Sequence, residues 1–467
     1  MTIPMPSRFP VHHGGLLAQD DRRISLSPFH VIARVLLIAT ICGAPWAFGA
    51  VQPWAWGTLL VLAMLTLVLW AVGCAHRGVL KITWSPLYWP FLAFLILAVL
   101  QLITGWNTDH VATREAVLKI ITNLAFFFLV GQLLNAQPEN GSALELLGPI
   151  VTLLAFSLSF LGLVQISSGG ARSIYWTYTP LIDTAVFGPY VNHNNYAGLM
   201  EMLVPISVVY LLSRHSNLLL RLLMWGGVII VIVSVWMSGS RAGAVVLLIE
   251  GLVLTGILIW QRPRGVSPLL FVVLLGVALT SAVFFSWLVS MGRVGGRAWS
   301  VFETHRSLRV SFGDRWWVGI DTLHMAWSHP WAGVGVGCFE CAFPKYMTNP
   351  MDLHWIHAHD DIFEAAAETG LPGVLIMVVA IVLFLRKGFG QIRDRLRYGW
   401  GWIQIGAALG ALGLFFHSFV DFNLRIPANA AWFVVCLAIA THSGPAQKIR
   451  RKIAPAPNAN RGSEFLT

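Results

Sequence analysis

The sequence predicts an all-α polytopic membrane protein, and two observations carry this prediction. The first is composition, because 56% of the 467 residues are hydrophobic and only 11% are charged. The second is patterning, because apolar runs long enough to cross ~30 Å of hydrocarbon as helices recur along nearly the whole chain. These runs are solidly apolar, which excludes the alternating pattern of an outer-membrane β-barrel.

About twelve segments have the length and apolar character of a transmembrane helix. In chain order they cover roughly residues 31–50, 54–74, 86–104, 116–135, 145–166, 195–213, 218–238, 241–260, 268–290, 370–385, 401–419 and 427–443. Residues 1–30 have no apolar core, so we expect no cleavable signal peptide. The loop between the seventh and eighth spans is very short, residues 239–240, and the eleventh span ends around the polar pair His417 and Asp421.

The basic residues indicate the orientation of these spans. If the N-terminus is cytoplasmic, most of the 31 Lys and Arg residues fall in the inside tails and the short inside loops, as the positive-inside rule requires. We therefore expect both termini in the cytoplasm. The net charge of +10 then follows from topology, and nucleic acid is not needed as a partner to explain it.

This orientation places the long loop, residues 291–369, on the outer face, together with a shorter outer segment at about 167–194. Loops longer than about 12–15 residues are usually functional or disordered. The stretch "GDRWWVGIDTLHMAWSHPWAGVGVGCF" predicts an amphipathic helix followed by a glycine turn, so we expect this loop to be folded. It ends in "HAHDD" (357–361), a concentration of titratable groups in a chain that has few.

Three polar stretches are expected to converge on the outer face. They are "YVNHNNYAG" (190–198), "SGSRAG" (238–243), and the loop from Asp314 and Arg315 to "HAHDD" and "ETGLPG" (368–373). Each also has a structural interpretation. Asn194 or Asn195 could cap the sixth span and Ser240 the eighth, because their side-chain oxygens satisfy free helix N–H groups.

Two arginines in these stretches are suited to binding an anion. A guanidinium at the lip of an apolar helix, as at Arg241, costs a few kcal/mol unless it snorkels or is paired, so we expect it to face a polar cavity. Arginine grips phosphate or carboxylate through two parallel hydrogen bonds, and nearby helix N-termini add to anion binding. Arg315 offers a second such group, although a lone loop arginine is often simply solvated.

The histidines of "HAHDD" leave three interpretations open. His359, followed by Asp360 and Asp361, could be a general base near neutral pH with an acid to orient its ring. His357 could join these three residues as ligands of a divalent metal ion, although HxH spacing alone is weak evidence for a metal. The acids could also serve only as helix caps.

Carboxylates within the predicted spans mark a polar interior or a proton path. Glu201 and Glu250 lie inside such spans. His417 and Asp421 are four residues apart and would share a helix face if the eleventh span continues that far, where they could pair with each other or support the same cavity.

Between residues 185 and 430 the chain resembles the bacterial O-antigen ligase and Wzy-type polymerase superfamily. The ligase pattern of His, a small polar residue, nine residues, Gly, two residues and Gly matches His359, Asp360, Gly370 and Gly373. "SGSRAG", the "GDRWW" helix with "HPWAGVGVGCF", and "HSFVDFNLRIPANA" (417–430) are similar to family segments. Asp360 departs from the Asn, Ser or Gln usual in ligases, and "HAHDD" is closer to the "HAHN"-like form common in exopolysaccharide and protein-glycosylating relatives.

The resemblance implies transfer of a glycan from an undecaprenyl-pyrophosphate carrier on the periplasmic face, without a metal, other cofactor or nucleotide sugar. The acceptor would be lipid A core, a growing polysaccharide or a protein. Under this hypothesis His359 is the base or orients the acceptor, and Arg241 and Arg315 bind the pyrophosphate. The remaining expected substrate contacts are His193, Asn194, Asn195, His357, Asp360 and Asp361.

The expected organisation is a bacterial inner-membrane protein with a periplasmic site, in four parts. These are a cytoplasmic tail (1–30), N-terminal transmembrane helices (31–185), an O-antigen ligase-like core (186–443) that contains loop 291–369, and a basic cytoplasmic tail (444–467). The competing hypothesis is a lipid-linked oligosaccharide flippase, which should show internal repeats and polar groups near the bilayer midplane. A non-catalytic assembly partner is a third.

Overall fold

A computed structural model gives the architecture of the chain. It describes residues 27–80, 82–134, 143–168, 173–180, 186–213, 218–261, 276, 312–348 and 354–442. Within these ranges the protein is all-α and contains no strand, only two isolated β-bridges near residues 174–190. The all-α polytopic fold expected from the sequence is thereby confirmed.

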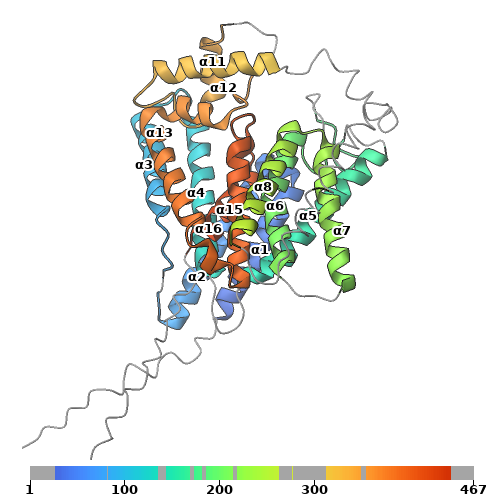
Figure 1. Ribbon diagram of the computed structural model, residues 1–467. Helices are drawn as coiled ribbons and strands as arrows, with labels where there is room; N and C mark the ends of the chain where they lie inside the picture. The colour runs from blue at the N-terminus through green and yellow to red at the C-terminus, as the bar shows by residue number, and fades with distance from the viewer. Residues whose placement is uncertain are drawn as a thin grey trace, which may run out of the picture.

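The described part contains fourteen α-helices, and Figure 1 labels all of them except α14. They are α1 Pro28–Gly43, α2 Pro53–Arg77, α3 Tyr88–Thr104, α4 His110–Leu133, α5 Ala143–Ser167, α6 His193–Ser213, α7 Leu218–Ser238, α8 Arg241–Gln261, α11 Phe312–Ser328, α12 Phe339–Ala342, α13 Asp361–Gly388, α14 Ile392–Arg395, α15 Gly399–His417 and α16 Pro427–Thr441. Short 3₁₀ turns add η1 Ala44–Trp46, η2 Phe48–Ala50, η3 Phe343–Lys345 and η4 Asn423–Arg425.

The helices match the predicted spans with two differences. Nine helices of the described part are long and apolar enough to cross a membrane, and α3 and α16 are shorter apolar helices. The predicted span at 268–290 lies outside the described residues except for Gly276, so the count of twelve stays a prediction. The span predicted from 370 corresponds to the part of α13 that follows the kink at Gly370, and the structure adds a helical part before the kink, which begins at Asp361 and is capped by Asp360.

The centre of the bundle is the pair α6 and α15. Within an apolar stretch of 18 residues, 83% of α6 is buried, compared with 22% of α7. Helix α6 is therefore central in the bundle and α7 is peripheral. Two glycines of α15 allow the backbones to approach closely. A Cβ at Gly410 would lie 2.7 Å from the Cα of Met202, and one at Gly406 would lie 2.8 Å from the Cα of Ile206. Small residues at such contacts let membrane helices associate through van der Waals packing.

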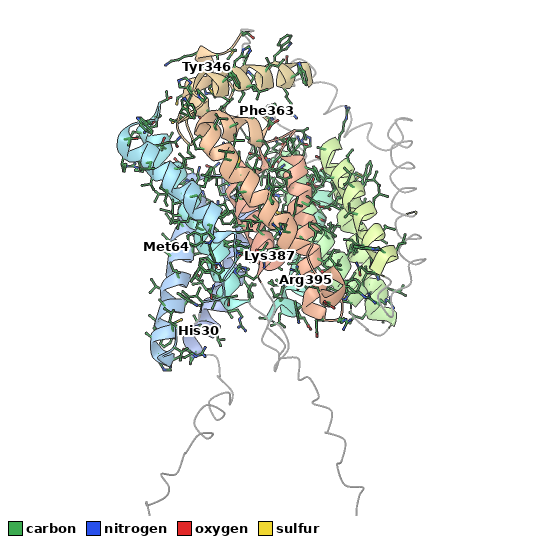
Figure 2. The ribbon with its side chains drawn as sticks, turned by 60° about the vertical axis from the view of Figure 1, so that its left-hand side comes forward. His30, Met64, Tyr346, Phe363, Lys387 and Arg395 are labelled. Carbon is green, nitrogen blue, oxygen red and sulfur yellow. The ribbon has the colours of Figure 1, made fainter. Side chains whose placement is uncertain are left out.

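A cap of short elements covers one end of the bundle. The amphipathic helix α11 lies across this end, above α12 and the start of α13 (Figure 1). It is followed by a turn with positive φ at Gly333, Gly335 and Gly337, so the sequence-predicted helix and glycine turn are both present. We call this end of the molecule the α11 end. Figure 2 shows Tyr346 and Phe363 there, with Lys387 and Arg395 toward the opposite end.

The bend in α13 joins this cap to the membrane helices. Gly370 has a φ of 64° and a ψ of −163°, which a residue with a side chain rarely adopts. A Cβ at Gly370 would also lie 2.6 Å from the carbonyl oxygen of Pro330. The N–H of Leu371 donates to that same carbonyl at 2.7 Å. The first glycine of the ligase-like pattern therefore allows the α11 end to sit directly on α13.

Candidate active site

The "HAHDD" segment leads directly into α13. Asp360 is the N-cap, and its carboxylate accepts hydrogen bonds from the N–H groups of Ile362 and Phe363, both at 2.9 Å. His359, just before it, has a φ of 56°. This left-handed conformation is uncommon for residues with a side chain and clusters at functional sites. The cap and the turn together fix where the imidazole of His359 lies.

The ring of His359 is held by aromatic side chains and faces a carboxylate. It meets Trp355 and Phe422 edge-on, with ring centroids 5.7 and 4.8 Å apart. Its Nδ1 lies 3.4 Å from Oδ1 of Asp421. The His359 side chain is 15% exposed and that of Asp421 is 1% exposed. The carboxylate is thus buried beneath an imidazole that remains accessible, which is how an acid orients a general base.

Asp421 is an ionised carboxylate surrounded by donors. Burial alone would raise its pKa, but the nearby His359, followed by Arg315 and His417, lowers it below the ordinary range. Its Oδ2 accepts a hydrogen bond of 2.5 Å from the amide of Asn194, and its Oδ1 accepts one of 2.9 Å from the N–H of Phe422. Asp421 therefore links the start of α6, the end of α15 and the "HAHDD" turn.

Arg315 lies on the first turns of α11 and acts on Asp421 through its charge. Its Nε is buried, and no protein group in the described ranges accepts a hydrogen bond from it. Arg241 is the first residue of α8 and is exposed. Ser240 caps that helix, since its Oγ accepts from the N–H of Gly243 at 3.2 Å. No described contact joins Arg241 to His359.

The N-terminus of α8 nevertheless belongs to the same end of the bundle as His359. A Cβ at Gly243 would lie 2.6 Å from Ala197 of α6 and 3.1 Å from Oε1 of Glu201. That carboxylate is bonded at 2.7 Å to Nδ1 of His417, and both side chains are fully buried. The second glycine of "SGSRAG", Gly243, therefore leaves room for the buried pair of Glu201 and His417, and His417 lies four residues before Asp421.

The three polar residues at the start of α6 have different surroundings. Asn194 reaches Asp421, as described, and His193 begins the helix. Asn195 is 2% exposed, and its amide donates to Oδ1 of Asn423 at 3.3 Å. Asn429 donates both to Asn423 at 3.1 Å and to the carbonyl of Asn195 at 2.8 Å. The side chain of Asn195 thus takes part in a buried amide network that joins α6 to α16.

A second cluster of charged residues lies beside His359, and most of its members were not predicted from the sequence. Asp361, Glu364 and Glu368 lie along one face of α13, and all three are buried. Arg425 of η4 bonds Glu364 at 3.1 Å and Glu368 at 2.7 Å, and lies 3.9 Å from Asp361. The three acids are spaced over two helical turns, and this spacing was the one sign of the cluster in the sequence. Their cation, Arg425, could not be assigned from it, because Arg425 lies 57 residues after Glu368.

His357 joins this second cluster. Its Nδ1 lies 3.0 Å from Oε1 of Glu364, whose Oε2 accepts from the N–H of Ala358 at 2.8 Å. Its ring also contacts Phe422, at a centroid distance of 4.8 Å. The two histidines of "HAHDD" therefore contact the same phenyl ring, and each has its own carboxylate.

The described residues give no support to the metal interpretation. Within these ranges, no three His, Cys, Asp or Glu side chains are grouped so that they could hold a metal ion. The Nδ1 atoms of His357 and His359 face two different carboxylates, and Asp360 is used as a helix cap.

Comparison with known families gives an independent result. Residues 226–378 match the family model described as O-antigen ligase. The resemblance to the O-antigen ligase and Wzy-type superfamily is confirmed. The match covers about a third of the chain and runs from within α7 to the middle of α13, so it contains Arg241, Arg315, His357 and His359. A search of curated proteins gives no match.

Several residues of the site lie outside the matched segment. Asn194, Asp421, Phe422 and Arg425 come from α6 and from the connection between α15 and α16. The three-dimensional structure brings them to the O-antigen ligase segment. The connection between α15 and α16, which lies outside the matched segment, therefore supplies the buried acid of the His359–Asp421 pair.

The pKa of Asp360 gives a testable pH dependence of stability. Burial raises it from 3.8 to about 6, against the opposing effect of the two backbone hydrogen bonds. A group whose pKa is higher in the folded state stabilises the fold at low pH, and this contribution is lost as pH rises through about 6. Asp360→Asn keeps a good cap without the buried charge. We expect it to raise the unfolding temperature by about 2–4 °C at pH 8.

The measurement is thermal unfolding of the purified protein in detergent at pH 8 and at pH 4.5. The gap between Asp360→Asn and wild type should shrink at the lower pH, where the wild-type carboxyl is neutral in the folded state. A gap that is constant, or that grows on acidification, would contradict this account of Asp360.

Proposed function

We propose that this membrane protein transfers a glycan from an undecaprenyl-pyrophosphate carrier to an acceptor hydroxyl at the α11 end. The observation that carries the proposal is the His359–Asp421 pair, in which an accessible imidazole lies over a buried, ionised carboxylate. The O-antigen ligase match over residues 226–378 supports the same class of reaction.

The reaction needs a base for the acceptor and a stabiliser for the departing pyrophosphate. Because Nδ1 of His359 faces Asp421, Nε2 is the nitrogen that takes the proton of the acceptor hydroxyl. The acceptor oxygen then forms a bond to the anomeric carbon, and the bond from that carbon to the pyrophosphate oxygen breaks. Asp421 stabilises the imidazolium, and the electron pair leaves with the pyrophosphate.

Arg315 and Arg241 are proposed to bind the pyrophosphate. The unpartnered Nε of Arg315 and its proximity to Asp421 support this role for the first arginine. The exposed position of Arg241 at the N-terminus of α8 supports the second, because helix N-termini favour anions. His193 and Asn194 would border the donor. Asp360 caps the helix that follows the histidines, and Asp361 accepts a hydrogen bond of 2.9 Å from the N–H of Leu424 in the connection between α15 and α16.

We further propose that the α11 end faces the periplasm of a bacterium and that both termini are cytoplasmic. Lys387 and Arg395 lie toward the opposite end of the molecule from Phe363 (Figure 2). An excess of basic residues on that side is the pattern of cytoplasmic loops. The acceptor would be lipid A core, a growing polysaccharide or a protein.

The test is transfer from a purified undecaprenyl-pyrophosphate-linked glycan by the full-length protein in nanodiscs. We expect wild type to transfer and His359→Asn, Arg315→Gln and Arg241→Gln to be impaired. His354→Asn is the matched control, since His354 is an exposed histidine of the same loop that is paired with Glu340. A chelator should leave the rate unchanged.

The outcomes separate the competing hypotheses. Equal transfer by wild type and His359→Asn would contradict the catalytic role of His359. Movement of labelled carrier across the bilayer without any bond to an acceptor would favour a flippase. The product from a panel of lipid A core, polysaccharide and protein acceptors would distinguish ligase, polymerase and protein-glycosylating activities.

A further inference from the structure

We propose that His357, oriented by Glu364, binds a second hydroxyl of the acceptor, next to the hydroxyl that His359 deprotonates. The acceptor is then a sugar with neighbouring hydroxyls and not the single hydroxyl of a Ser or Thr side chain. This inference rests on the proposed function and adds the chemical class of the acceptor to it.

The first argument is the way in which His357 is held. Glu364 is 1% exposed, and its two oxygens are fixed by the N–H of Ala358 and by Nε of Arg425. One of those oxygens faces Nδ1 of His357 at 3.0 Å. The orientation of the imidazole is therefore set, and Nε2 is the ring nitrogen left for a ligand. The side chain of His357 is 26% exposed, so a ligand can reach it.

The second argument is that His357 and His359 share one wall. Both rings lie with their centroids 4.8 Å from that of Phe422, one tilted at 32° and the other edge-on at 76°. Ala358, between them, is buried, and the left-handed backbone of His359 turns the chain at this point. Two oriented imidazoles two residues apart, on one aromatic ring, suit two hydroxyl groups on adjacent carbons of a sugar.

The third argument is charge, which decides which substrate lies on the His357 side. Behind His357 lie the carboxyl groups of Glu364, Glu368 and Asp361 with one guanidinium, that of Arg425. A pyrophosphate would be repelled from such surroundings. Arg315 instead acts on the His359–Asp421 side. The donor anion therefore belongs near Arg315, and the uncharged acceptor belongs near His357.

The experiment compares acceptors with and without the neighbouring hydroxyls. Wild type, His357→Gln and Glu364→Gln in nanodiscs are given the undecaprenyl-pyrophosphate donor and one of several probes. The probes are octyl β-D-glucopyranoside, octyl β-D-galactopyranoside, their monodeoxy derivatives, and a peptide with Ser and Thr. Loss of one neutral hydrogen bond should raise KM for the best sugar about tenfold and change kcat little.

The decisive feature is non-additivity. A deoxy sugar that lacks the hydroxyl bound by His357 should show the raised KM with wild type and no further rise with His357→Gln. Glu364→Gln should give an intermediate KM, and His354→Gln should match wild type. A structural defect would instead lower kcat on every acceptor by the same factor, which overturns the inference.

The remaining outcomes distinguish the inference from the function it rests on. Transfer by wild type to the peptide but to no sugar leaves the proposed transferase intact and overturns the role of His357. Equal KM values for wild type and His357→Gln on all sugars do the same. If wild type transfers to no probe and to no acceptor of the earlier panel, the transferase proposal fails and this inference fails with it.

Discussion

Replacement of His359 should lower the rate of glycan transfer at saturating substrates by about 100- to 10,000-fold, the usual contribution of a positioned general base. His359→Asn is the preferred variant, because asparagine tolerates the left-handed backbone that this position adopts. The measurement is kcat with the lipid-linked donor in nanodiscs. Donor binding should change little, since the pyrophosphate is assigned to the arginines.

Asp421 provides the internal test of this prediction. If Asp421 acts through His359, Asp421→Asn should itself lower kcat, and the double variant should be scarcely slower than His359→Asn alone. The His354→Asn control should keep the wild-type rate. Independent, multiplying losses in the double variant would show that the 3.4 Å contact between these residues has no catalytic meaning.

The sequence was sufficient for the fold class, and for a physical reason. Apolar runs of transmembrane length indicate a lipid environment. Apart from a closed β-barrel, an α-helix is the structure that can pair all of its backbone N–H and C=O groups in lipid. The glycine turn after α11 and the polar ends of α6, α8 and α13 were also readable, because caps and turns are local. The helical part of α13 before Gly370 was not predicted, since residues up to 369 were assigned to the loop, whereas the part after the kink at Gly370 corresponds to the predicted span.

The partners within the site were not readable from the sequence. His417 and Asp421 lie four residues apart and were expected to share a helix face if the helix continued as far as Asp421, but α15 ends at His417. Asp421 turns to His359, while His417 pairs with Glu201, 216 residues away. Such contacts depend on how α6 and α15 pack, and a single sequence contains no record of that packing. The same holds for Arg425 and the acids of α13.

Removal of the guanidinium of Arg425 should have the largest effect on stability. Burial lowers the pKa of Arg425, but Glu364, Glu368 and Asp361 raise it well above its ordinary value, so the charge is firmly held. Arg425→Gln would leave three buried carboxyl groups without a cation. Breaking a buried ion pair by removing one partner costs about 3–5 kcal/mol. Thermal unfolding in detergent at pH 7.5 should therefore show a fall of many degrees.

The cause of this loss can be separated from simple loss of packing. Arg425→Gln combined with Glu364→Gln and Glu368→Gln removes the uncompensated charge and should recover much of the stability, because a neutral network costs less to bury. Arg397→Gln is the matched control. Arg397 is 66% exposed and its contact with Asp394 is 3.7 Å, so its replacement should change the free energy of unfolding by at most about 1 kcal/mol.

Two outcomes would change this account. If the triple variant unfolds at as low a temperature as Arg425→Gln, Arg425 stabilises the fold through its packing and not through its charge. Recovery of the fold without recovery of transfer would instead show that stability and the orientation of His357 both depend on this cluster, since Glu364 is the one acid among the described residues that contacts both Arg425 and His357.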